Sequence, residues 1–351
     1  MLRAWLPAEP AATDQMRPLV CWYDGSKLAA SQTFTNGVVH SSSGGWTCDV
    51  NKRRVDDAPD AQDLSVTFKL TDGIAKSAGV AVAFDFTDWS ANNYVLVPGV
   101  VYDGNRFHTI GHGYMPAYPR EMFFNPKLPL TISDDPRLSI EPGQASKIEL
   151  LTGNAATPAM CFYSPSQKRG FILLCEQKTR FGNNGLFIEE NAAQDKITFV
   201  VSAPGVRERA AHFGGFGPSG DRGADWKAGD ELTLKLRTYS FSADGIPALL
   251  EKFMSVRQAL TGLNQPRQLV PMSAMRNAIV PRFKKRWMTV PAGNYYACEN
   301  SRDFQLGWVS GFMQTPMLAI DDPLEREHIC QQLDFVTEKL QGKSGLVPRR
   351  L

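Results

Sequence analysis

The densest group of chemically versatile side chains lies on one irregular segment, from Phe84 to Glu121. Its strand-like runs lead into a stretch that is too rich in glycine and proline to form a helix. The candidates for ligand contact on this segment are Trp89, Tyr102, Asp103, Asn105, Arg106, His108, Tyr118 and Arg120. Flat rings beside charged hydrogen-bonding groups suit a polar ligand. The segment therefore predicts a ligand-contacting surface, and the alternative is a long connection between sheets whose aromatic side chains cover the core.

A second group of such side chains lies near the C-terminal end, in a predicted loop that precedes a helix. Its members are Tyr295, Tyr296, Glu299, Asn300, Arg302, Asp303 and Trp308. The ordinary explanation is helix capping, with Ser301 or Asp303 as the N-cap residue and Trp308 in the core.

Patterns for metal and cofactor sites are weak throughout the chain. The six cysteines include no CxxC pair, so a structural zinc site is not expected. His108 and His112 lie on a predicted loop and are not a helical ligand pair. A metal bound by these two histidines and Asp103 is therefore the less favoured interpretation. Glu189 and Glu190 are expected to be solvated acids of a hairpin, not calcium ligands. We predict no metal and no cofactor.

Phosphate-binding loops and nucleophile elbows are also missing as motifs. The glycine-rich run at 214–223 lacks the Lys-Ser or Lys-Thr ending of a phosphate-binding loop, and no G-x-S-x-G occurs. Cys161 and Cys175 flank a predicted hairpin and could face each other, although a chain of 351 residues needs no disulfide to fold.

The composition is that of an ordinary globular protein, with 43% hydrophobic residues, 21% charged residues and a net charge of +2. Lysine and arginine are dispersed, so no nucleic acid partner is expected, and the basic run at 282–287 suits a solvated helix face. No window reaches membrane-spanning length, and Pro7, Glu9 and Pro10 interrupt any signal-peptide core. We predict no membrane partner; the oligomeric state is not indicated.

Residues 1–245 have the pattern of a large antiparallel β-sandwich. Short apolar or alternating runs are separated by clusters of Gly, Asn, Asp and Pro. The predicted strands include 20–23, 33–35, 64–70, 79–84, 147–151, 159–163, 171–176, 185–190, 196–202 and 231–241. Many strands without interleaved helices favour a sandwich, and the lack of a fixed repeat argues against a propeller.

From residue 246 the pattern becomes helical. An amphipathic helix at 246–260 and a polar linker form a connecting segment at 246–271, and residues 272–351 form a helical domain. Its predicted helices lie at 272–288, 304–319 and 323–341. Three helices cannot bury their apolar faces alone, so they pack on the sandwich or begin a larger helical domain. We expect the second arrangement, in a truncated chain.

This layout, together with the run Gly307-Trp308-Val309-Ser310-Gly311-Phe312-Met313, resembles bacterial carbohydrate-active enzymes. In those glycoside hydrolases and phosphorylases a β-sandwich precedes a toroid of paired helices, the (α/α) barrel. The resemblance implies an active site at the mouth of the toroid, which a loop of the sandwich such as 102–121 reaches. The resemblance also implies a periplasmic or secreted protein, whereas the sequence by itself does not indicate the compartment.

The resemblance implies a glycoside hydrolase that acts on a polysaccharide or oligosaccharide. Such enzymes use two carboxylates, for which Glu299 and Asp303 are the candidates in this chain. Substrate contacts would come from the eight candidates of the 84–121 segment and from Tyr296 and Trp308. The alternatives are a polysaccharide lyase that uses Tyr118, His112 and Arg120 on a uronate, and a glycan-binding sandwich without catalysis.

Overall fold

The computed structural model describes residues 15–106, 136–212, 215–262, 270–297, 322–343 and 345. The chain forms two compact units, Met1–Gly262 and Leu263–Leu351. The first unit is β-rich and the second is small, with helices and one hairpin.

The first unit contains a seven-stranded sheet, in which the described pairings are antiparallel. In spatial order its strands are β2 (Lys27–Thr33), β1 (Gln15–Asp24), β6 (Ile74–Phe86), β15 (Ile197–Ala203), β14 (Gly185–Glu190) and β9 (Ser146–Leu151). The seventh strand, β18 (Ala224–Lys227), also pairs with β6.

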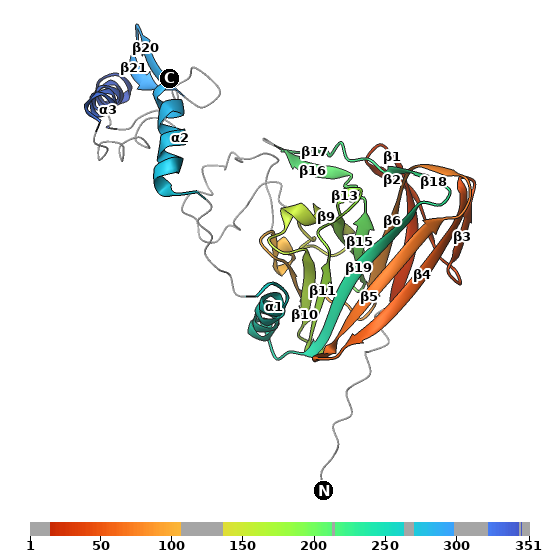
Figure 1. The fold of residues 1–351 in the computed structure, drawn as a ribbon. Helices are drawn as coiled ribbons and strands as arrows, with labels where there is room; N and C mark the ends of the chain where they lie inside the picture. The colour runs from red at the N-terminus through yellow and green to blue at the C-terminus, as the bar shows by residue number, and fades with distance from the viewer. Residues whose placement is uncertain are drawn as a thin grey trace. The chain divides into compact units, whose positions relative to one another are not determined.

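An eight-stranded antiparallel sheet forms the second layer (Figure 1). Its order is β3 (Val38–Ser41), β4 (Gly44–Val55), β5 (Ala58–Leu70), β19 (Glu231–Ser242), β11 (Arg169–Cys175), β10 (Ala159–Ser164), β7 (Tyr94–Val97) and β8 (Val101–Tyr102). Small ladders join β12 (Lys178–Thr179) to β13 (Gly182–Asn183) and β16 (Arg209–His212) to β17 (Gly215–Pro218). The predicted antiparallel β-rich region is thus confirmed.

The inner faces of the two sheets pack against each other around Phe86. Its ring lies 4.9 Å from Phe162 and 5.0 Å from Phe171, both of the second sheet, and 5.5 Å from Phe199 of its own sheet. These edge-on contacts suit the quadrupoles of aromatic rings. Alternation along the strands supplies the other buried residues of this core, because every second side chain points inward.

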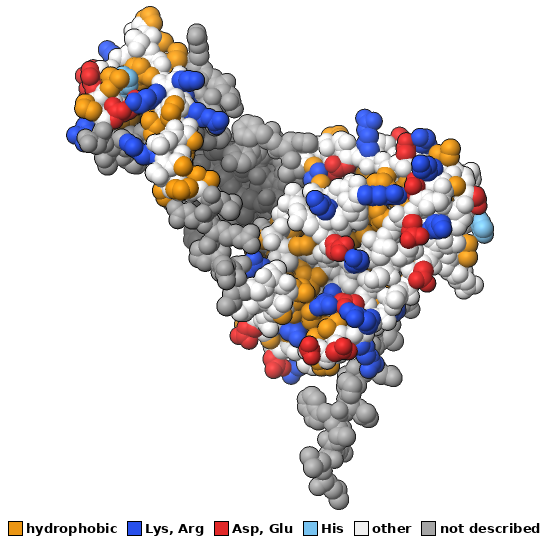
Figure 2. Space-filling view, viewed as in Figure 1, with side chains coloured by type: hydrophobic (Ala, Val, Ile, Leu, Met, Phe, Trp, Pro, Cys, Tyr) orange, Lys and Arg blue, Asp and Glu red, His pale blue; other side chains and the backbone are white. Residues whose placement is uncertain are grey.

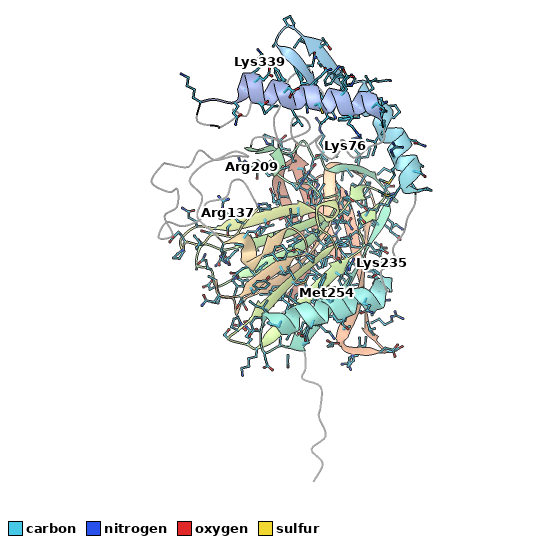
Figure 3. All side chains as sticks on the ribbon, turned by 90° about the vertical axis from the view of Figure 1, so that its left-hand side faces the viewer. Lys76, Arg137, Arg209, Lys235, Met254 and Lys339 are labelled. Atoms are coloured by element: carbon cyan, nitrogen blue, oxygen red, sulfur yellow. The ribbon has the colours of Figure 1, made fainter. Side chains whose placement is uncertain are left out.

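The outer face of the eight-stranded sheet is covered in part by α1 (Ile246–Thr261), which lies beside β10 and β11 (Figure 1). Leu249, Phe253 and Val256 of α1 are buried against the sheet. Met254, labelled in Figure 3, is 56% exposed and lies on the opposite side of the helix. In Figure 2 the face that carries β4, β5 and β19 shows acidic and basic side chains intermixed. Asp63 of β5 forms ion pairs with Arg53 of β4 and with Arg237 of β19.

The cysteines that the structure describes carry free thiols: Cys21, Cys48, Cys161, Cys175 and Cys330. Cys161 lies across the β10–β11 ladder from Ile172, so it does not face Cys175. Burial raises the pKa of the Cys161 thiol, which keeps it protonated and unreactive.

The first described element of the second unit is α2 (Met272–Lys284), which is shorter than the predicted helix at 272–288. Trp287 and Met288 instead start β20 (Trp287–Val290), and Tyr295 and Tyr296 lie in β21 (Gly293–Tyr296), which was expected to be a loop. Five of the eight strand residues are aromatic or β-branched, namely Trp287, Thr289, Val290, Tyr295 and Tyr296, which favours these strands. Residues 291 and 292 form the turn.

The remaining described elements of this unit are helical. The predicted helix at 323–341 is present as α3 (Pro323–Phe335), continued by the π-helical turn η5 (Val336–Leu340). The first unit also contains two short 3-10 turns, η1 (Asp103–Asn105) and η3 (Thr152–Asn154). The predicted helix at 304–319 lies outside the described residues, so the (α/α) toroid stays a prediction.

Across the described ranges, no helix combines the length and the apolar character needed to span a membrane.

We expect Phe86→Ala to lower the free energy of unfolding by about 3–5 kcal/mol, because the surrounding rings cannot collapse into the space it leaves. Ile74→Ala, in the same strand but at a 61% exposed position, should change it by less than about 0.5 kcal/mol. Urea unfolding followed by circular dichroism measures both. Equal effects of the two substitutions would contradict the packing described for Phe86.

Candidate functional site

The residues predicted to contact a ligand fall into three groups. Trp89, Tyr102, Asp103, Asn105 and Arg106 lie together in the first unit, where β6 leads into β7, β8 and η1. Tyr296 lies in the second unit. The others lie outside the described residues: His108, His112, Tyr118, Arg120, Glu299, Asp303 and Trp308.

Glu190, at the end of β14, organises the first group. Its side chain is fully buried, and Arg106 donates to both carboxylate oxygens, from Nη1 to Oε2 at 3.0 Å and from Nη2 to Oε1. Trp89 Nε1 donates to Oε1 at 2.7 Å. Arg106 also donates to the carbonyl oxygen of Ser139. We call Glu190, Arg106 and Trp89 the Glu190 clamp.

The clamp joins the two sheets, because Glu190 ends a strand of one sheet and Arg106 follows β8 of the other. The Trp89 ring is only 7% exposed and packs edge-on against Phe162 at 5.3 Å. Trp89 therefore uses its polar atom within the protein, and Arg106 uses Nη1 and Nη2 there, while its buried Nε has no hydrogen-bond partner among the described residues. The expectation that Glu190 is a solvated acid is wrong, since its charge is buried and paired.

Next to the clamp the chain makes a left-handed turn of three residues. Asp103, Gly104 and Asn105 have φ values of 53°, 64° and 51°. Such a conformation costs roughly 1–2 kcal/mol for each residue that has a Cβ atom. Asn105 offsets this cost, because its Oδ1 accepts from Tyr102 N at 3.0 Å and its Nδ2 donates to Val100 O and Pro136 O.

The turn places Tyr102 and Asp103 in solvent. Tyr102 is 54% exposed, and its hydroxyl oxygen accepts a hydrogen bond from Gly99 N at 3.1 Å, which fixes the ring. Tyr102 pairs with Leu96 across the β7–β8 ladder, so Tyr94, two residues before Leu96, lies on the same face. We call Tyr94, Tyr102 and Asp103 the Tyr102 patch.

The patch offers a ring face, an acceptor and a donor. Burial, and then the charge of Asp103, raises the pKa of Tyr94, so its hydroxyl stays protonated. Asp103 is exposed and its carboxylate can accept hydrogen bonds. In the part of the chain that the structure describes, no group of three or more His, Cys, Asp or Glu side chains is placed to hold a metal ion. The patch therefore suits binding of a neutral polar molecule.

In the second unit Tyr296 is fully buried, and its hydroxyl donates to Glu325 of α3. Sequence reasoning missed both Glu325 and its neighbour His328. Glu325 stands three residues after the N-cap residue Asp322, a spacing that ordinarily indicates a helix cap.

The Glu190 clamp yields a direct test of buried charge. Glu190→Gln should lower the free energy of unfolding by about 3–5 kcal/mol, because it leaves the Arg106 guanidinium buried without its counter-charge. Arg106→Met combined with Glu190→Leu should recover most of this loss in a urea titration. Arg53→Gln, which breaks an ion pair at a 76% exposed arginine, should cost under about 1 kcal/mol. A Glu190→Gln effect as small as that control would contradict the clamp.

Comparison with known proteins gives no family. No protein-family model matches the chain, and no curated protein matches it. Among solved structures, a putative aldose 1-epimerase from Escherichia coli K12 is 12% identical, with 58% of this chain and 68% of that chain covered and a TM-score of 0.30. A putative aldose 1-epimerase from Klebsiella pneumoniae is 8% identical, with 67% and 57% covered and a TM-score of 0.36.

A TPR-domain containing protein from Parabacteroides distasonis is also similar in part. It is 11% identical, with 86% of this chain and 52% of that chain covered and a TM-score of 0.31. All three TM-scores lie well below those of shared folds, so these likenesses carry no argument about what this chain binds or does.

Proposed function

We propose that the chain is a carbohydrate-active protein whose β-rich unit contacts a polysaccharide or oligosaccharide through the Tyr102 patch. The observation that carries the proposal is an exposed tyrosine ring, fixed through its hydroxyl, beside a carboxylate on a strained left-handed turn. Strained backbone that is held by specific bonds is concentrated at functional sites.

The chemistry of sugars matches this arrangement. A pyranose ring has C–H faces that stack on an aromatic ring and hydroxyl groups that need both donors and acceptors. In the patch, Tyr102 supplies the ring, Asp103 the acceptor and Tyr94 the donor. Because Gly99 holds the Tyr102 hydroxyl, little side-chain entropy is lost on binding.

The finer form of the proposal is a glycoside hydrolase whose second unit begins an (α/α) toroid. Its support is the resemblance in layout and the run at 307–313. Glu299 and Asp303 are the proposed carboxylates, with Tyr296 and Trp308 as further substrate contacts. The candidates Trp89, Asn105, Arg106, His108, Tyr118 and Arg120 stay predictions for the sandwich side.

One observation favours the second candidate, a lyase that acts on uronates. Nε and Nη2 of Arg286 are buried and make no hydrogen bond within the described structure. A carboxylate would satisfy both nitrogen atoms, as bidentate arginine pairs do. A lyase needs such an arginine to neutralise the uronate, and it leaves an unsaturated product that absorbs in the ultraviolet.

Tyr102→Ala should weaken binding to a polysaccharide roughly 5-fold to 30-fold, the equivalent of about 1–2 kcal/mol, because the stacking face is lost. Retardation in native gels that contain plant or microbial polysaccharides measures the dissociation constants. Tyr102→Phe keeps the ring and should lose less, while Ile74→Ala removes an exposed apolar side chain elsewhere and should lose nothing. Unchanged binding by Tyr102→Ala, or no retardation of the parent protein by any polysaccharide, would sink the proposal.

Glu299→Gln should reduce the release of reducing ends from a bound polysaccharide by about 100-fold or more, if this carboxylate takes part in proton transfer. Glu338→Gln changes an exposed carboxylate of the same unit and should leave the rate unaltered. Rates near normal in Glu299→Gln would remove this residue from the reaction. Release of a product that absorbs in the ultraviolet together with the reducing ends would favour the lyase.

A further inference from the structure

The second unit contains a polar cluster of which the proposed function uses only Tyr296. Tyr296 comes from β21, Lys284 from the end of α2, and Glu325 and His328 from the first turns of α3. Glu325 is 2% exposed and Tyr296 is fully buried. Groups of this kind are kept in a protein interior only when their hydrogen bonds are satisfied.

Glu325 is the acceptor at the centre of the cluster. Its Oε2 accepts the hydroxyl proton of Tyr296, and its Oε1 lies 3.6 Å from Lys284 Nζ. Lys284 also binds Asp322 at 2.7 Å, and this bond, together with Glu325, raises the pKa of Lys284. Lys284 Nζ and the N-terminus of α3 both lie next to Glu325. As a carboxylate Glu325 can only accept hydrogen bonds.

The direction of the hydrogen bond at Tyr296 follows from this. Burial, and then the bond to Glu325, raises the pKa of the Tyr296 hydroxyl, which therefore keeps its proton. That single proton is directed to Glu325. The hydroxyl oxygen also lies 3.3 Å from Nδ1 of His328, and toward this neighbour it can act only as an acceptor.

The tautomer of His328 is then determined. Nδ1 must carry the hydrogen that it donates to Tyr296, which leaves the lone pair on Nε2. The imidazole ring is held flat on Trp287, with centroids 4.0 Å apart and planes at 13°. Its side chain is 18% exposed, so it is not sealed in the core.

We infer that His328 is a proton-accepting group whose Nε2 takes a proton from a ligand hydroxyl, with Tyr296 and Glu325 as positioning residues. In this step the ligand O–H bond breaks, its electron pair stays on oxygen, and an Nε2–H bond forms. The resulting imidazolium keeps its Nδ1–H bond to Tyr296, and the carboxylate of Glu325 stabilises the added charge through Tyr296. That the hydroxyl belongs to a sugar rests on the proposed function.

The test reads the tautomer in the full-length protein labelled with nitrogen-15 in its histidines. Long-range proton–nitrogen spectra distinguish Nδ1–H from Nε2–H rings, and His328→Gln assigns the resonance among the five histidines. We expect the Nδ1–H form for His328. Exposed His40 is an internal reference that should not change between variants. An Nε2–H ring at His328 in the parent protein overturns the inference.

Two variants examine the positioning residues. Tyr296→Phe keeps the ring that stacks on Phe283 at 4.2 Å but removes the acceptor, and the Nδ1–H preference should be lost. Glu325→Gln should have the same effect, because a glutamine amide can donate to the Tyr296 oxygen and release its proton toward His328. Near-ultraviolet circular dichroism of the whole protein, to which all seven tryptophans contribute, verifies that each variant is folded. A preserved Nδ1–H form in both folded variants overturns the relay.

The ligand step is read separately. A polysaccharide that is retarded in the gel experiment should shift the His328 Nε2 resonance when it is added at saturation. If the polysaccharide binds and the resonance does not move, His328 is not the acceptor of a ligand hydroxyl. If no polysaccharide binds, the proposed function and the sugar assignment fail, while the tautomer result still decides whether His328 is poised as an acceptor.

Discussion

The burial of the two inner sheet faces against each other is the contact on which the first unit depends. An antiparallel sheet with one apolar face is stable only when that face is covered, and here each sheet covers the other. The rings around Phe86 occupy the centre of this contact. At one end of the sandwich the Glu190 clamp adds a polar tie between the sheets, and it fixes the point at which the chain leaves β8.

The Tyr102 patch is held in place by the residues around it. The clamp fixes Arg106, Asn105 joins the turn to Val100 and Pro136, and Tyr102 is then placed through the backbone and through Gly99. The patch has few bonds of its own. Its geometry is set by neighbours that are themselves buried, which is the arrangement that a binding surface requires.

Local patterns in the sequence predicted much of the fold. Alternation along 231–241 and the paired runs at 159–163 and 171–176 correspond to β19, β10 and β11, and the amphipathic run at 246–260 corresponds to α1. The hairpin at 287–296 was missed because short apolar runs beside a helix fit either structure. Gly293 allows the hairpin to pack closely on Phe335, because a Cβ atom at this position would lie 2.1 Å from the Phe335 ring. This contact joins segments that are far apart in sequence.

The candidate site was predictable only in part, for a similar reason. Residue types identified the segment around Tyr102, but they could not distinguish an exposed ring from a buried one such as Trp89. Glu190 has its arginine partner 84 positions earlier, and Tyr296 has its carboxylate partner 29 positions later. The residues next to Glu190 and Tyr296 in the sequence do not indicate these distant partners.

The turn at 103–105 also constrains how this surface can change in evolution. Position 105 needs a residue that tolerates a left-handed backbone and that supplies one acceptor and two donors on a short side chain. Asparagine meets both needs; aspartate lacks the donors, glycine lacks all three groups, and glutamine is longer and disfavours the backbone. Drift at Tyr102 and Asp103 can therefore alter ligand preference while the asparagine stays, so relatives with other specificities should share Asn105 more often than the residues that it presents.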